Sequence, residues 1–219
     1  MLVVRLPVMI HIWLKEIDSR WFGAALHDGA LVATAASDAR DAVRRAILRS
    51  LPGDAPWRFM EEHSEESRST IRMLADLEQG KEERARFELS PLYVLEPLRS
   101  VLRTAAAIPR GYVTTYGSIA KVARADAQTV GRIMATNPLY PVVPCHRVVG
   151  SDLSLTGYRG SRKAPALLAK LERLRGERQG FEGESMIETA GMLKVVPVEW
   201  AIARAAKDGV TGARQLDLW

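Results

Sequence analysis

The chain has 219 residues, of which 47% are apolar and 26% are charged, and its net charge is +5. A chain of this length and apolar content can bury a proper core, which we expect to be split between two small domains. No apolar run reaches 18 residues, which excludes a helical membrane span, and a single cysteine excludes an internal disulfide. We therefore expect a reducing, intracellular environment.

Residues 1–34 predict strands. Residues 1–10 are apolar but lack the charged leader and cleavage site of a signal peptide, so we expect a strand there. Further apolar runs at 12–14, 21–26 and 30–33 surround Asp28-Gly29, and Asp-Gly between apolar runs is typical of a hairpin turn. After Ser37 and Asp38, which are candidate N-caps, apolar residues recur at helical spacing until Pro52. These elements predict a small α+β unit.

The histidines of this unit, His11, His27 and His63, lack metal-ligand spacing, so we expect no metal. Residues 61–86 are rich in glutamate, and Leu74 and Leu77 give only a thin apolar seam, which predicts a solvated helix with a connecting segment. Prolines at 91 and 97 then mark a boundary between a first domain at 1–90 and a second at 91–180.

Charge is distributed unevenly along the chain. Residues 1–96 have 13 basic and 16 acidic side chains, residues 97–180 have 14 and 4, and residues 181–219 have 4 and 6. The middle segment therefore has a net charge of +10 between acidic flanks. Such a segment is typical of a domain that binds a polyanion, and an ordinary solvated surface is the alternative interpretation.

Within the basic segment, a helix predicted from Leu98 stops at Pro109, and two short helices follow. Thr114 or Thr115 can cap the first of these, and Asp126 can cap the second, which ends at Asn137-Pro138. The second helix has an inward face with Ala127, Val130 and Met134. Its outer face is small and basic, with Gln128, Gly131, Arg132 and Ala135. This pattern matches a helix–turn–helix whose backbone can approach a nucleic-acid groove, and mere packing is the alternative.

Residues 137–149 read Asn-Pro-Leu-Tyr-Pro-Val-Val-Pro-Cys-His-Arg-Val-Val and contain the only cysteine and the only asparagine of the chain. His146 and Arg147 directly follow Cys145, and an imidazole or a positive charge stabilises the nucleophilic thiolate. Without such help the pKa of a thiol is about 8.5, which leaves little thiolate at neutral pH. An inert buried cysteine is the alternative interpretation.

Asn137-Pro138 followed by Pro-Cys-His-Arg-Val at 144–148 resembles the active-site signature of the O6-alkylguanine-DNA alkyltransferases. The resemblance implies an α+β fold class, with a small ribonuclease-H-like α/β domain and a mainly helical C-terminal domain with a helix–turn–helix. It implies double-stranded DNA containing O6-alkylguanine as the partner, no cofactor, no membrane, and a monomer in the cytoplasm, or in the nucleus of a eukaryote. Some alkyltransferases bind zinc through N-terminal cysteines, which this chain lacks, so no metal is expected.

In the alkyltransferases the second helix enters the minor groove, a tyrosine before the first helix rotates the damaged nucleotide, and an arginine fills the vacated space. Tyr116 matches that tyrosine, whereas Gln128 stands at the position of the arginine. Either Gln128 wedges into the duplex itself, or Arg124 or Arg132 supplies the cation. Unstacking a base costs a few kcal/mol, so a weaker wedge slows repair without abolishing it.

The resemblance also implies a guanine pocket and a proton-transfer chain. Tyr158 matches a tyrosine that approaches the guanine edge, and Met134 matches an apolar wall of the pocket. Glu172, on a helix predicted at 163–175, falls where the family has a buried glutamate that orients the histidine, and a surface charge is the alternative. Asn137 is expected to bond backbone groups between the second helix and the active-site strand. The other predicted pocket residues are Arg147, Val148, Gly157, Arg159 and Gly160.

The implied reaction is a direct displacement. His146, oriented by Glu172, takes the Cys145 proton through a water, and the thiolate attacks the alkyl carbon while Tyr158 hydrogen-bonds or protonates the guanine. The thioether cannot be reversed, which predicts one transfer per molecule, and Tyr140 is a candidate to limit the size of the alkyl group. Two alternatives remain: a cysteine hydrolase, which turns over repeatedly, and a DNA-binding damage sensor that does not use the thiol.

Beyond about residue 180 the resemblance fades. Residues 195–197 lead into a helix predicted at 199–207, which Asp208-Gly209 closes. This extension, at 181–219, either fills the core or mediates contacts, and the sequence supports both interpretations.

Overall fold

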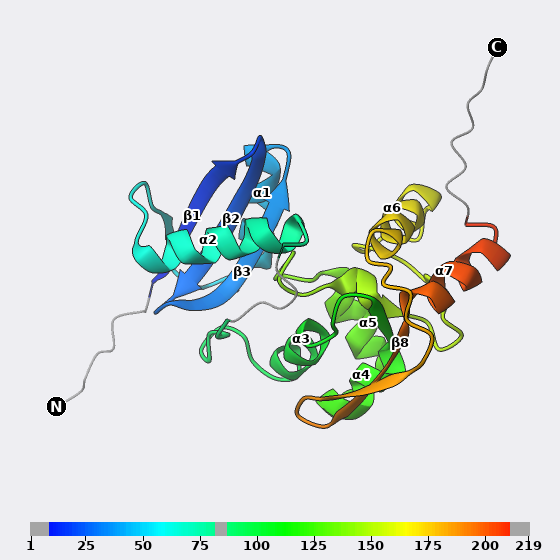
Figure 1. Cartoon of the computed structure of the whole chain (residues 1–219). Helices are drawn as coiled ribbons and strands as arrows, with labels where there is room; N and C mark the ends of the chain where they lie inside the picture. Colours follow the sequence, from blue (N-terminus) through cyan, green and yellow to red (C-terminus); the bar gives the residue numbers. More distant parts are fainter. Residues whose placement is uncertain (1–8, 82–86, 211–219) are drawn as a thin grey trace, which may run out of the picture. The chain divides into compact units, whose positions relative to one another are not determined.

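The structure is a computed structural model that describes residues 9–81 and 87–210 (Figure 1). Most of the strand predicted at residues 1–10 lies outside these ranges. The chain divides into two compact units: Met1–Leu102 with Pro138–Val143, and Arg103–Asn137 with Pro144–Trp219. Every helix among the described residues is too short or too polar to cross a bilayer.

The first unit is built on a four-stranded sheet with the order β3-β2-β1-β4. β1 (Ile10–Ile17), β2 (Arg20–His27) and β3 (Ala30–Ser37) are antiparallel neighbours, and β4 (Trp57–Phe59) is parallel to β1. The predicted hairpin is confirmed: Asp28 and Gly29 have φ angles of 48° and 76°, the positive values that a tight type I′ turn requires.

Two helices cover this sheet, and in Figure 1 α2 (Glu65–Glu78) lies in front of the strands and α1 (Arg40–Ser50) behind them. α1 packs closely because Gly23 has no side chain: an added Cβ would lie 2.6 Å from both Val43 and Ile47. The predicted N-caps of α1 are wrong, since the helix begins after Ala39 without a side-chain cap. α2 is also not the solvated helix that was predicted, because Ile71 joins Leu74 in a buried stripe.

Part of the cysteine-containing stretch belongs to the first unit. The Thr34 N–H donates to Pro138 O at 2.8 Å, and Thr34 Oγ1 donates to Tyr140 O at 3.0 Å. The Tyr140 hydroxyl donates to both carboxylate oxygens of Glu78, at 2.9 and 2.7 Å, and Arg20 pairs with the same carboxylate at 2.6 Å. Residues 138–143 are therefore fixed by backbone and side-chain bonds within this unit.

The second unit contains a sheet that the sequence patterns did not predict. β5 (Tyr112–Thr115) lies between β6 (Val148–Val149), which is parallel to it, and β8 (Met192–Pro197), which is antiparallel. β7 (Ser185–Glu188) pairs with β8 at the edge. The helices are α3 (Leu98–Ala106), shared with the first unit, α4 (Tyr116–Ala123), α5 (Ala127–Ala135), α6 (Ala164–Arg175) and α7 (Val198–Lys207).

The C-terminal extension fills the core of the second unit. β8 pairs with the central strand β5, and Leu193 and Val195 are fully buried. Val198, Ala201 and Ala205 of α7 are buried in one cluster with Val113, Leu171 and Leu174. Of the two interpretations of the extension, core filling therefore holds for these residues.

Truncation of a buried extension residue tests this packing. Leu193→Ala removes a fully buried side chain from β8 and is expected to lower the free energy of unfolding by about 2–4 kcal/mol. The neighbouring Met192→Ala is the control, because that side chain is exposed and its loss is expected to change stability by less than about 0.5 kcal/mol. Urea denaturation of both variants measures the difference, and equal stabilities would contradict the packing of the extension.

Candidate active site

A pair of short helices, α4 and α5, forms one side of the site. The predicted caps are confirmed: Ser118 N–H donates to Thr115 Oγ1 at 3.1 Å, and Thr129 N–H donates to Asp126 Oδ1 at 2.8 Å. Arg124 ends α4 in the left-handed conformation, with φ of 52°, which allows the chain to turn sharply into α5.

The two faces of α5 are largely as predicted. Val130 and Met134 are buried, but Ala127 is exposed, so its assignment to the inward face is wrong. Gln128, Arg132 and Ala135 are exposed on the outer face. A Cβ atom added to Gly131 would meet no heavy atom within 4 Å, so the helix backbone is open to an approaching ligand at this point.

Cys145 begins a short 3-10 turn, Cys145–Arg147, and its side chain is buried. Burial raises the pKa of the thiol, and this effect outweighs a hydrogen bond from the Asn137 side chain and the positive charges of Lys170, Arg159 and Arg173. The thiol is therefore neutral at neutral pH and needs a base to become a nucleophile. The contact between Asn137 and Cys145 adds to the backbone role that the sequence predicted for Asn137.

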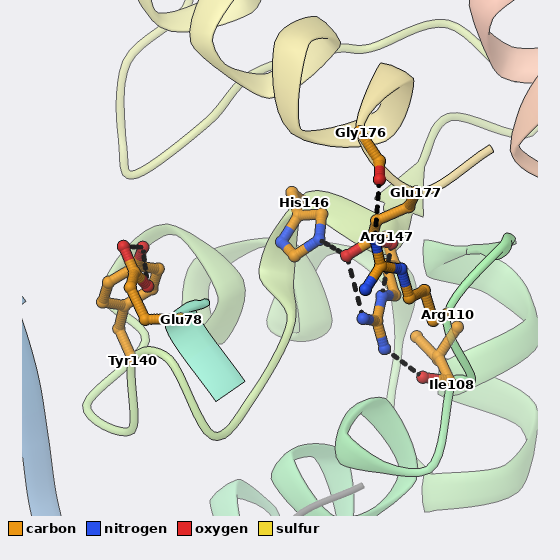
Figure 2. A network of polar contacts seen from close by, with 8 residues as sticks. All are labelled: Glu78, Ile108, Arg110, Tyr140, His146, Arg147, Gly176 and Glu177. Carbon is orange, nitrogen blue, oxygen red and sulfur yellow. Dashed lines mark hydrogen bonds and ion pairs between the residues drawn. The ribbon is translucent and has the colours of Figure 1, made fainter. Parts of the chain in front are cut away.

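His146 is the nearest base in the sequence, and it is paired with a carboxylate. Its Nε2 atom lies 2.7 Å from Glu177 Oε1, and Arg147 donates to the same carboxylate through Nε and NH2, each at 2.8 Å (Figure 2). Burial opposes ionisation of Glu177, but His146 and Arg147 together hold the pKa of the carboxyl group at about 2. Glu177 is therefore an anion that can only accept hydrogen bonds.

This pairing determines the form of the imidazole. Burial lowers the pKa of His146 more than Glu177 raises it, so the ring is neutral at neutral pH. A neutral ring that donates from Nε2 to a carboxylate has a free lone pair on Nδ1. The Nδ1 atom is buried and has no hydrogen-bond partner among the described residues, so it is available to accept a proton.

The prediction that Glu172 orients the histidine is wrong, because Glu177 occupies that place. Glu172 lies on the exposed face of α6 and pairs with Arg175 at 2.6 Å. The physical reason is the helical period: Leu171 and Leu174 point into the core, and residue 172 is rotated away from both. Glu177 follows Gly176, which ends the helix, and so it is free of the helical period.

Lys170 is a buried residue of the site that the sequence analysis missed. Its Nζ atom donates to the carbonyl oxygens of Val148, Leu155 and Gly157, at 2.5, 3.0 and 3.1 Å. Burial lowers its pKa to about 8, although Cys145 acts in the opposite direction. The signal was present in the sequence, since Lys170 falls on the same helix face as Leu171 and Leu174.

A cavity of about 590 Å³ opens beside Cys145. Its walls are α5 and the loop after β6, and most of the predicted DNA-binding and pocket residues line it. The predicted residues at the cavity are Tyr116, Gln128, Gly131, Arg132, Met134, Ala135, Cys145, Gly157, Tyr158, Arg159 and Gly160. Arg124, Arg147, Val148 and Tyr140 do not line it.

These four residues have other places in the structure. Arg124 forms the cap between the two helices, and Arg147 binds Glu177 and the carbonyl of Ile108. Val148 is buried in β6, where it pairs with Thr114. Tyr140 is bonded to Glu78 within the first unit.

The loop that closes the cavity has a defined turn. Tyr158 and Ser161 exchange two backbone hydrogen bonds, at 2.8 and 2.9 Å, around Arg159 and Gly160, which both have positive φ angles. The Tyr158 side chain is buried. Thr156 of the same loop lies with its Oγ1 atom 3.4 Å from the hydroxyl of Tyr116, and burial raises the pKa of the Tyr116 phenol.

Comparisons with known proteins identify relatives of the second unit. Residues 97–178 match the family described as 6-O-methylguanine DNA methyltransferase, DNA binding domain. A methylated-DNA–protein-cysteine methyltransferase of Pyrobaculum aerophilum is 58% identical over 53 residues, which are 24% of this chain and 36% of the relative. One from Mycolicibacterium paratuberculosis is 43% identical over 77 residues, which are 34% of this chain and 47% of the relative. These matches span less than half the length of either relative.

Solved structures of similar fold cover more of the chain. Mycobacterium tuberculosis OGT in complex with DNA has a TM-score of 0.54 at 22% identity and covers 77% of this chain and 92% of its own. The O6-methylguanine-DNA methyltransferase of Pyrococcus kodakaraensis has the same TM-score at 23% identity, with 75% and 98% covered. At these identities the comparison establishes a similar mixed α+β fold.

The depressed pKa of Glu177 gives a prediction for stability. Its usual pKa is 4.5, so the stability that its ionised form contributes is complete above that pH and is lost as the pH falls toward 2. Glu177→Gln is expected to lower the free energy of unfolding by about 3 kcal/mol at neutral pH, with a difference that shrinks below pH 4.5. Urea denaturation across this range measures it, with the exposed Glu172→Gln as the control. A difference that stays constant down to acidic pH would contradict the pairing.

Proposed function

We propose that this chain repairs O6-alkylguanine in duplex DNA by transferring the alkyl group to Cys145, because residues 97–178 match the DNA-binding domain of the 6-O-methylguanine DNA methyltransferases. The observation on which this depends most is the cavity: it is the place where the reactive thiol and the outer face of α5 meet. A damage sensor would not need a base beside the cysteine, and a hydrolase would not need the basic helix pair.

DNA binding is proposed for the helix pair, acting as a helix–turn–helix with α5 in the minor groove. Support comes from the net charge of +10 on residues 97–180 and from the open position at Gly131. Contacts to phosphates supply most of the affinity of such surfaces for DNA. Because Gly131 has no side chain, the backbone of α5 can come close to the groove at this position.

The damaged base is proposed to leave the stack and enter the cavity between Met134 and Tyr158. Tyr116 guides the rotation of its phosphate, as the family resemblance implies. Gln128 and Arg132 stand one helical turn apart at the mouth of the cavity, whereas Arg124 lies away from it. We propose that Gln128 fills the vacated space and that Arg132 supplies the positive charge.

The base for the reaction is the free Nδ1 atom of His146. Glu177 fixes the ring by accepting from Nε2, and Nδ1 takes the Cys145 proton through one water. As the imidazole becomes positively charged, the adjacent carboxylate stabilises it. A thiol whose pKa is raised by burial thus becomes a nucleophile only when this base acts.

The alkyl transfer is a direct displacement. Sulfur forms a bond to the alkyl carbon while the bond between that carbon and O6 breaks, and the electron pair remains on guanine. Tyr158 donates a hydrogen bond or a proton to the departing base. The product is a thioether on Cys145, the only cysteine of the chain, so each molecule acts once and requires no cofactor.

Intact mass spectrometry tests the transfer. After incubation with a duplex that contains one O6-methylguanine, the protein is expected to gain the mass of one methyl group, and Cys145→Ser is expected to gain none while it still binds DNA. Titration with excess duplex is expected to stop at one methyl group per molecule, because the thioether is stable. Repeated turnover would overturn the proposal, and binding without transfer would favour a damage sensor.

A second test separates DNA binding from folding. Gly131→Leu places a side chain on the open face of α5, and it is expected to weaken binding to a short duplex more than about tenfold at fixed salt. The same change replaces a poor helix former and is expected to maintain or raise the melting temperature. Fluorescence anisotropy and thermal unfolding give the two quantities. Unchanged affinity would mean that this face of α5 does not approach DNA.

A further inference from the structure

Glu177 lies just past the end of the helix that precedes it, so the helix holds its backbone N–H but does not set the direction of its side chain. α6 ends at Arg175, and the last backbone bonds of the helix run from Glu177 N–H to Leu174 O at 3.1 Å and from Arg178 N–H to Arg175 O at 3.4 Å. Residues 177–184 then connect α6 to β7 without regular secondary structure. A carboxylate at the start of such a connector needs other contacts to stay 2.7 Å from His146.

One of these contacts comes from the C-terminal helix. Glu199 Oε1 accepts hydrogen bonds from the backbone N–H groups of Gln179 at 3.3 Å and Gly180 at 3.0 Å. Glu199 is the second residue of α7, whose neighbouring Val198 is fully buried, so its position is fixed by the core. A single carboxylate oxygen therefore anchors the connector two and three residues after Glu177.

A second contact lies one residue further along. The Phe181 ring stacks on Tyr112 with 4.7 Å between centroids and 19° between planes. It also lies over Gly111, where φ is 85° and an added Cβ would stand 2.7 Å from the Phe181 ring. Gly111 O accepts from Val198 N–H at 2.9 Å, so Phe181 is seated where β5 meets α7.

On the other side of Glu177, Arg110 donates to the carbonyl of Gly176 at 2.8 Å (Figure 2). This contact lies within the part of the chain that matches the family model, residues 97–178, whereas Phe181 and Glu199 lie beyond it. The connector that follows Glu177 is therefore anchored both from within the matched segment and from the C-terminal extension.

We propose that Glu199 and Phe181 are positioning residues, which hold the connector at 177–184 so that Glu177 stays bonded to His146. The inference rests on the proposed function, because it assigns His146 as the base for Cys145. It gives the C-terminal extension a role in the reaction in addition to its role in the core.

The hydrogen bonds of Glu177 explain why a small displacement of the connector breaks its bond to His146 before its bonds to Arg147. Glu177 makes two bonds to Arg147 but one to His146, so a connector that relaxes keeps the arginine pair and loses the histidine bond. The other charges that act on His146 are Arg147 and Arg173, which both disfavour its protonation. Without Glu177, the imidazole is a weaker base.

The test uses the full chain and iodoacetamide, a small electrophile that requires no DNA. The rate of Cys145 alkylation is followed by intact mass as a function of pH. Glu199→Ala is expected to lower the rate at neutral pH by about fivefold and to shift the midpoint of the pH profile upward, since the base is weakened. Glu199→Gln retains an acceptor oxygen and is expected to restore most of the rate.

Two further variants complete the design. Phe181→Leu removes the ring stack by an independent route and is expected to change the profile in the same direction as Glu199→Ala. Glu182→Ala removes an exposed charge from the same connector and is expected to match the unaltered chain. Thermal unfolding of each variant shows whether it is folded at the assay temperature. If Glu199→Ala is unfolded there, the pH profiles of the single variants Phe181→Leu and Glu199→Gln test the positioning role in its place.

A pH profile that Glu199→Ala and Phe181→Leu leave unchanged would overturn the inference. A uniform loss of rate at every pH, in proportion to a lower melting temperature, would also overturn it, because that pattern marks a purely structural role. Failure of the proposed function is a separate result: the unaltered chain would then gain no methyl group from the damaged duplex.

Discussion

The site depends on one carboxylate that two basic side chains share. Glu177 binds His146 through one hydrogen bond and Arg147 through two, and these two partners together keep the carboxyl group ionised although it is largely buried. An ionised acceptor at Nε2 leaves Nδ1 of the imidazole free. The residues around this pair, from Ile108 to Gly176, are arranged to hold it (Figure 2).

Burial is the second constraint, and it acts on both Cys145 and Lys170. It raises the pKa of Cys145, which keeps the thiol neutral, and it lowers the pKa of Lys170 to about 8, which still leaves the amine mainly protonated at neutral pH. Lys170 is tolerated inside because three carbonyl oxygens surround its Nζ atom. Those carbonyls belong to the strand after Cys145 and to the loop that walls the cavity, so one buried ammonium group fixes the shape of both.

The residues before Cys145 are held by a different set of bonds. Thr34 binds Pro138 and Tyr140 within the first unit, and Glu78 binds the Tyr140 hydroxyl (Figure 2). Arg20, which is partly exposed, pairs with the same Glu78 carboxylate. These bonds fix the segment because breaking one of them would leave a buried polar group unpaired, which costs more than the bond itself contributes. Tyr140 is thereby committed to the first unit and is absent from the wall of the cavity that it was predicted to restrict.

By itself, the sequence determined what local chemistry controls. The hairpin at Asp28-Gly29, the caps at Thr115 and Asp126 and the outer face of α5 all follow from short-range patterns, and the structure contains each of them. Only the tertiary structure decided which glutamate meets His146, why a lysine lies among leucines, and that the extension completes the central sheet. These depend on contacts between residues 22 to 85 positions apart, and local periodicity has no information about such pairs. Glu177 shows the reason most clearly, because the side chain of a residue just past the end of a helix does not follow the helical period, so its partner is set by tertiary contacts.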